Sequence, residues 1–255
     1  MHWYNKEGEP CHFVKGKNGK TRASTLRDAR AHGWMPSVTS VLDILAKPGL
    51  DAWKINKAIQ AASIVSRGDH EFDTWKDRVL IESKRETIEA SDRGSRIHGM
   101  LEEFFKTGNE PEYQEDKSIC YAVKSLLDIN CGEQQWRSEE IACNISGGYG
   151  GMIDLVSDEW VIDFKTKEFS SGSKQLAYES MAYQLIAYER ALPAPAKRIA
   201  NVFISSSNPG TVVFHEWDKE NHDRYWKIFE SSLEVWKNVK KYWPERFNKE
   251  KESSS

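Results

Sequence analysis

The hydrophobic pattern of the chain changes near residue 134. Before that point apolar residues recur at helical spacing, which places them on one face of each helix. The spacing predicts a helix over residues 36–46, a second ending near residue 66, and further helices over residues 72–90, 93–106 and 116–129. Ser37 or Thr39 is expected to cap the first helix. Residues 1–36 alternate turn sequences with short strand-like pieces, which predicts a small β-ribbon.

After residue 134 apolar and polar residues alternate, as they do along half-buried strands. This pattern predicts three consecutive strands over residues 139–145, 150–157 and 159–166, a helix over 175–192, strands over 198–206 and 211–217, and a final helix over 219–242. The core order is therefore α-β-β-β-α-β, and the predicted fold class is mixed α/β (α+β). Four segments are expected: a basic β-ribbon (1–36), a helical region (37–132), a core (133–243) and a flexible tail (244–255).

Charge and cysteine content narrow the class of protein. The net charge of −3 gives no basic field over the whole molecule, so contact with nucleic acid would depend on local patches. Residues 1–36 carry such an excess of Lys and Arg, although a solvated face explains it equally well. The four cysteines show no C-x-x-C spacing, so we expect free thiols and no iron–sulfur cluster. With no signal or transit peptide evident and no membrane-spanning run, a cytoplasmic protein of a bacterial or phage-infected cell is expected.

Two strand sequences carry charges where packing residues are expected. Asp163 and Lys165 lie two residues apart and therefore project from one face of their strand. Asp154 precedes Asp163 by nine residues, a separation that a tight turn can fold so that the two carboxylates converge. Paired carboxylates on rigid strands are typical ligands of Mg²⁺ or Mn²⁺. An Asp–Lys salt bridge on a solvated sheet is the structural alternative.

The surrounding residues favour the metal site over the solvated salt bridge. The residues flanking Asp154 and Asp163 are largely apolar, which indicates that the charges are half-buried. Glycines also precede Asp154 at positions 147, 148, 150 and 151, where another group can approach the backbone closely.

Several short motifs occur in an order that resembles a known nuclease family. Gly151-x-x-Asp154 followed by Ile162-Asp163-Phe164-Lys165 resembles the motif of the PD-(D/E)XK nucleases, whose common core is αβββαβ. The sequence Gln184-x-x-x-Tyr188 resembles the helical motif of the RecB-like branch. Pro36-Ser37-Val38-Thr39 and Gly94-x-x-x-His98 are similar to motifs of the mitochondrial genome maintenance exonucleases and their phage and bacterial relatives. The resemblance extends from residue 36 to residue 242.

The resemblance assigns a role to each motif. It implies that His98, Asp154, Asp163 and the backbone carbonyl of Phe164 bind one or two Mg²⁺ or Mn²⁺ ions. His98 alone would otherwise be read as a helix-surface partner of Glu102. Lys165 would position the attacking water. Gln184 and Tyr188 would steady the side chain of Lys165, although packing explains Tyr188 equally well. Supporting roles are expected for Glu102 and for either Glu139 or Glu140, and Arg93, Lys167 and Lys174 are expected to contact DNA.

The sequence thus predicts a metal-dependent deoxyribonuclease. The resemblance implies an exonuclease that acts on single-stranded DNA with a free end, in replication, recombination or repair. Two alternatives remain open: a structure-specific or recombination endonuclease of the same superfamily, and a catalytically silent protein that binds DNA or assembles with other proteins.

Overall fold

The computed structural model describes residues 1–170, 172, 176–194 and 198–246. The chain divides into two compact units, one formed by Met1–Ile44 with Met100–Ser255 and the other by Leu45–Gly99. The division into four segments expected from the sequence stays a prediction. Helices and strands are mixed, as the sequence predicts. In the described ranges, no helix combines the length and the apolar character that crossing a membrane requires.

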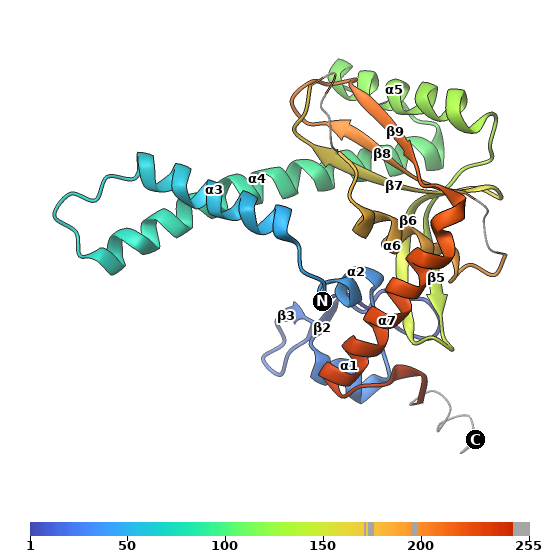
Figure 1. Cartoon of the computed structure of the whole chain (residues 1–255), viewed down its shortest axis with the longest axis horizontal. Helices are drawn as coiled ribbons and strands as arrows, with labels where there is room; N and C mark the ends of the chain where they lie inside the picture. Colours follow the sequence, from blue (N-terminus) through green and yellow to red (C-terminus); the bar gives the residue numbers. More distant parts are fainter. Residues whose placement is uncertain (171, 173–175, 195–197, 247–255) are drawn as a thin grey trace. The chain divides into compact units, whose positions relative to one another are not determined.

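A five-stranded sheet forms the centre of the first unit (Figure 1). Its strands follow the chain in spatial order: β5 (Arg137–Asn144), β6 (Tyr149–Val156), β7 (Trp160–Lys167), β8 (Arg198–Ser205) and β9 (Val212–Glu216). Only β7 and β8 run parallel, because α6 (Glu179–Glu189) connects them. The predicted strands match those observed, with ends that differ by one or two residues.

Helices cover both faces of this sheet (Figure 1). On one face α5 (Gln114–Cys131) packs against β8 and β9, and the ring of Phe164 stacks on Phe105. On the other face α6 packs against β6, β7 and β8, and α7 (His222–Lys240) packs on α6. A short 3₁₀ turn, η1 (Lys219–Asn221), precedes α7. The sequence of elements from α5 to β8 is therefore α-β-β-β-α-β, in the predicted order.

The N-terminal residues form more than the expected ribbon. Strand β1 (Trp3–Tyr4) pairs with β4 (Met35–Pro36), and β2 (Phe13–Lys15) pairs with β3 (Thr21–Ala23). Between β3 and β4 along the chain lies helix α1 (Leu26–His32), which the sequence did not predict. Thr25 and Asp28 cap its start, and Gly33, with a φ of 73°, ends it. Ser37 caps α2 (Val38–Leu42) by accepting a hydrogen bond from the Ser40 amide, one of the two expected caps.

The second unit holds α3 (Pro48–Ile64) and most of α4 (Phe72–Thr107). The indole Nε1 of Trp75 donates a hydrogen bond to the carbonyl of Val65 at 2.8 Å, which joins the start of α4 to the end of α3. The sequence predicts two helices where α4 is continuous, so that prediction is wrong. Gly94 lowers helix stability by only about 1 kcal/mol, and without a proline at this point the helix continues.

Candidate active site

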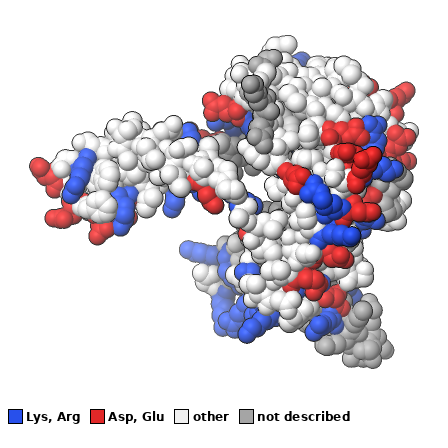
Figure 2. Space-filling model, in the orientation of Figure 1, with Lys and Arg blue, Asp and Glu red and all other residues white. Residues whose placement is uncertain are grey.

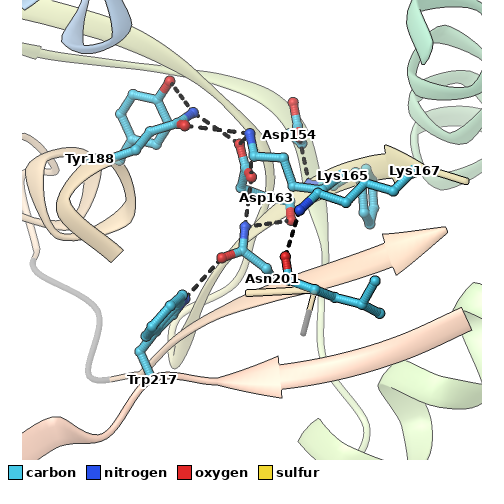
Figure 3. A network of polar contacts seen from close by, with 10 residues as sticks. Asp154, Asp163, Lys165, Lys167, Tyr188, Asn201 and Trp217 are labelled. Atoms are coloured by element: carbon cyan, nitrogen blue, oxygen red, sulfur yellow. Dashed lines mark hydrogen bonds and ion pairs between the residues drawn. The ribbon is translucent and has the colours of Figure 1, made fainter. Parts of the chain in front are cut away.

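The polar residues of the sheet form a row across its strands. Asp163 on β7 lies beside Asn201 on β8, which lies opposite His215 on β9. The pairing of Leu155 with Ile162 places Asp154 opposite Asp163 in the same register. Glu139 continues the row on β5, because its neighbours on both sides pair with the neighbours of Asp154. Asp154, Asp163 and Asn201, which come from three strands, therefore converge on one face of the sheet (Figure 3).

Asp163 lies at the centre of this row, and its carboxylate is surrounded by donors. The side chain is buried, with 6% of its surface exposed. Its Oδ1 accepts hydrogen bonds from Lys165 Nζ and Gln184 Nε2, both at 2.9 Å. Its Oδ2 lies 2.7 Å from Asn201 Nδ2 and 2.8 Å from Lys165 Nζ. Each carboxylate oxygen offers two lone pairs, so Asp163 can accept all of these hydrogen bonds at once.

The carboxylate of Asp154 accepts a hydrogen bond from a backbone amide of the neighbouring strand, in place of a backbone carbonyl. The backbone pairing of β6 with β7 ends at Leu155 and Ile162, and the Phe164 amide instead donates to Asp154 Oδ2 at 2.7 Å. The N–H and C=O groups of one strand residue point to the same side. The carbonyl of Phe164 therefore also faces β6, where the resemblance places a metal ligand.

Lys165 contacts Asp163 and lies within the electrostatic influence of Asp154. Its side chain is 27% exposed and contacts Asp163, while its Nζ lies 3.4 Å from Gln184 Oε1. Burial alone would lower the pKa of Lys165, but the charges of Asp163 and Asp154 outweigh it, so the pKa is raised above its ordinary value. The ammonium therefore stays protonated at neutral pH and acts as a cation and hydrogen-bond donor.

Gln184 and Tyr188 approach the site from α6, one helical turn apart. Gln184 Nε2 bonds Asp163 and also donates to the Tyr188 hydroxyl at 3.0 Å (Figure 3). The partner that a glutamine on an apolar helix face requires is thus Asp163. Tyr188 is buried, and this burial, followed by the charge of Asp163, raises the pKa of its hydroxyl well above the ordinary value. Tyr188 therefore packs in the core and holds Gln184 at the same time.

Gly151 leaves the space that Tyr188 occupies. A Cβ atom at position 151 would lie 2.3 Å from Cε1 of the Tyr188 ring. This distance is far shorter than a van der Waals contact, so only glycine fits beside the tyrosine in this arrangement. The sequence suggested close approach at this glycine, and the structure identifies the approaching group.

Asn201 and Trp217 belong to the network although the sequence analysis did not select them. Asn201 Nδ2 donates to Asp163, and Asn201 Oδ1 accepts from the indole Nε1 of Trp217 at 2.8 Å (Figure 3). A signal was present in the sequence. Asn201 is the one amide in the apolar strand sequence Ile199-Ala-Asn-Val-Phe-Ile204, and such a residue needs a buried partner.

Glu139, rather than Glu140, borders this row. Glu139 has a backbone φ of 51°, and its carboxyl group shares a hydrogen bond with that of Glu102 on α4. Partial burial and this contact raise the pKa of Glu139, with a smaller effect from the charge of Asp154. Glu140 instead lies 3.9 Å from Arg137. Glu102 therefore contacts the carboxyl group of Glu139. A role for Glu102 in orienting His98 stays a prediction.

Three other predicted residues lie in the second unit or outside the described residues. His98 and Arg93 lie on α4 in the second unit, where His98 is half-buried and Arg93 is exposed. Their roles in metal and DNA binding stay predictions. Lys174 lies outside the described residues.

Lys167 is occupied by contacts within the protein. Its Nζ donates to the Leu176 carbonyl at 2.5 Å and lies over the rings of Tyr178 and Phe203, at 4.6 and 5.3 Å from their centroids. Burial and the neighbouring charge of Lys165 lower the pKa of Lys167 to about 8. These contacts tie β7 to the segment that leads into α6, so a phosphate contact would require Lys167 to leave them.

Replacing Lys167 by Met is expected to affect stability in a pH-dependent way. Between pH 8 and the ordinary pKa of 10.5 the unfolded chain binds a proton that the folded protein has lost, so the wild type gains stability as pH rises. Lys167→Met lacks this gain. Its free energy of unfolding relative to wild type should therefore fall by about 1 kcal/mol between pH 7.0 and 9.5, after allowance for partial exposure. Urea unfolding at both pH values measures it, and a difference that does not change with pH would contradict it.

The donor set suits a hard divalent cation. Within the described ranges, no group of three or more His, Cys, Asp or Glu side chains forms a complete metal cage. Mg²⁺ is commonly held by one or two carboxylates together with water and substrate phosphate, so Asp154 and Asp163 fit its needs. A cation at Asp163 would have to displace one of the donors that now contact it.

The comparisons with known proteins leave the family unassigned. A scan against protein-family models and a search of curated proteins returned no match to this sequence. Function is therefore inferred from the geometry of the site and from the resemblance of its motifs.

Proposed function

We propose that the chain is a Mg²⁺- or Mn²⁺-dependent deoxyribonuclease with a PD-(D/E)XK core. The observation that carries this proposal is the cluster of Asp154, Asp163 and Lys165 on adjacent strands, contacted by Gln184 from the following helix. A solvated Asp–Lys pair would not require a buried carboxylate with donors from three separate elements. The α-β-β-β-α-β order gives additional support.

Each side chain has a distinct task in this proposal. Lys165 remains protonated, so it donates to a phosphate oxygen or to the attacking water and offsets negative charge that develops on the phosphate. Gln184 orients the ammonium through Oε1 and the carboxylate through Nε2. Tyr188 fixes Gln184 from the buried side. Lys165 is not assigned as the general base, because its raised pKa keeps the amine protonated and so leaves it no lone pair to accept a proton.

Asp154 and Asp163 would hold the cation, with the Phe164 carbonyl and His98 as the further ligands that the resemblance implies. A bound Mg²⁺ or Mn²⁺ would supply charge stabilisation at the scissile phosphate and make water more acidic. Lys165 then has to turn from Asp163 toward the substrate. Its partial exposure is compatible with such a movement.

A basic surface in the same unit supports DNA as the substrate. Figure 2 shows Lys and Arg side chains gathered over β2, β3 and α1. Lys15, Lys17, Lys20, Arg27 and Arg30 are exposed there. Binding through such residues releases counterions, so affinity for DNA should fall as salt rises.

The substrate preference is tested with linear and circular single-stranded DNA of one sequence. An exonuclease should shorten the end-labelled linear strand in Mg²⁺ or Mn²⁺ and leave the circle intact, while a chelator stops the reaction. Ionic strength has to be low and fixed, because binding is salt-sensitive. Metal-dependent nicking of the circle would indicate an endonuclease. Failure to cut either substrate, or equal cutting by Lys165→Met, would contradict the proposed function.

A further inference from the structure

Asn201 is the most deeply buried polar residue in contact with the site. Its exposed fraction is 0%, because β8 lies between β7 and β9. Asn201 Nδ2 donates to Asp163 twice, to Oδ2 at 2.7 Å and to the backbone carbonyl at 3.2 Å. Two hydrogen bonds to one residue restrict both the backbone position and the side-chain rotation of Asp163.

Trp217 determines which way the Asn201 amide points. An indole N–H can only donate, so the atom of Asn201 that faces it has to be the carbonyl oxygen. The NH₂ group is then forced to face Asp163. If the amide turned over, its oxygen would face the carboxylate and its NH₂ would face the indole N–H, and both contacts would be repulsive.

The two oxygens of Asp163 therefore have different freedom. Oδ1 contacts Lys165 and Gln184, which are half-buried side chains with several rotatable bonds. Oδ2 also lies 2.8 Å from Lys165 Nζ, but it is held in addition by Asn201, which is rigid because both ends of its amide are bonded and the residue is fully buried. When a ligand approaches Asp163, Lys165 and Gln184 can move, whereas Asn201 cannot.

We propose that Asn201, oriented by Trp217, is a positioning residue that fixes Asp163 Oδ2 and leaves Oδ1 as the oxygen that exchanges its donors for a divalent cation. This inference rests on the proposed function and extends it to two residues outside the recognised motifs. A preset carboxylate binds a cation without first losing rotational freedom, so the pair should act on metal affinity.

The test measures Mn²⁺ binding by calorimetry in the absence of DNA, for wild type, Trp217→Phe and Asn201→Ala. Trp217→Phe keeps an aromatic ring but removes the indole donor. Partners of this kind commonly change metal affinity by about 10–100-fold, so we expect the Kd for Mn²⁺ to rise at least about tenfold in both variants. The Mg²⁺ concentration for half-maximal cleavage should rise in parallel.

Trp236→Phe is the matched control. Trp236 is fully buried on α7, and no described residue accepts a hydrogen bond from its Nε1, so the substitution removes ring volume without removing such a bond. Thermal unfolding of each variant separates stability from metal affinity, and Trp217→Phe decides the question if Asn201→Ala does not fold.

Two outcomes would overturn the inference alone: Mn²⁺ affinity of folded Trp217→Phe equal to wild type, or an equal loss of affinity in Trp236→Phe. A wild type that neither binds Mn²⁺ nor cleaves DNA would overturn the proposed function together with it.

Discussion

Asp163→Asn is expected to reduce metal-dependent DNA cleavage by more than about a thousandfold, which corresponds to roughly 4 kcal/mol of transition-state stabilisation. The substitution keeps the shape of the side chain but removes a hard anionic ligand. It also places an NH₂ group among the donors of Lys165, Gln184 and Asn201. The measurement is single-turnover cleavage of end-labelled DNA in Mg²⁺, with calorimetric titration of Mn²⁺ on the same samples.

A buried aspartate elsewhere provides the control for folding. Asp116 has an exposed fraction of 7% and lies in the first turn of α5, away from the polar row. Asp116→Asn should retain cleavage even if it lowers the melting temperature. Loss of activity in Asp163→Asn with the fold intact supports the site, and full turnover by folded Asp163→Asn would remove Asp163 from the proposed chemistry.

The parts of the site that lie close in sequence could be predicted. Period-two alternation placed Asp163 and Lys165 on one face and Phe164 on the other, and Phe164 indeed stacks on Phe105 while Lys165 contacts Asp163. The nine-residue separation of Asp154 and Asp163 matched a turn in which the Ser157 amide bonds the Trp160 carbonyl. Short turns fix register, so these contacts follow from local rules.

Contacts across the parallel pair of strands could not be predicted in the same way. The register of β7 with β8 depends on how α6, which connects these strands, packs on the face of the sheet, and 38 residues separate Asp163 from Asn201. The pattern indicated that Asn201 needed a partner but gave no means to choose among the polar residues of the neighbouring strand. The position of Glu139 could not be predicted either, because its positive φ departs from the regular strand geometry on which the alternation of side chains depends.

Gly151→Ala is expected to show how strongly the site depends on packing at one glycine. The added Cβ would lie 2.3 Å from Cε1 of Tyr188, so the tyrosine ring has to move. Overpacking of this kind costs about 1–3 kcal/mol of stability. A moved Tyr188 no longer holds Gln184, and a displacement near 1 Å at a reacting group can lower a rate by about a hundredfold. Urea unfolding and single-turnover cleavage measure the two effects.

A double-mutant cycle identifies the cause of this expected loss. Tyr188→Leu removes the ring, so adding Gly151→Ala to it should cost much less stability than adding it to the wild type, with a coupling of at least about 1 kcal/mol. Gly49→Ala is the control, because a Cβ at that helical position meets no atom within 4 Å, so this substitution should not lower stability and should raise it by up to about 1 kcal/mol. Equal costs of Gly151→Ala in both backgrounds would show that Tyr188 is not the group that requires glycine there. In that case the link from the glycine of the motif to Gln184 would be lost, while the contacts of Gln184 with Asp163 would still need their own test.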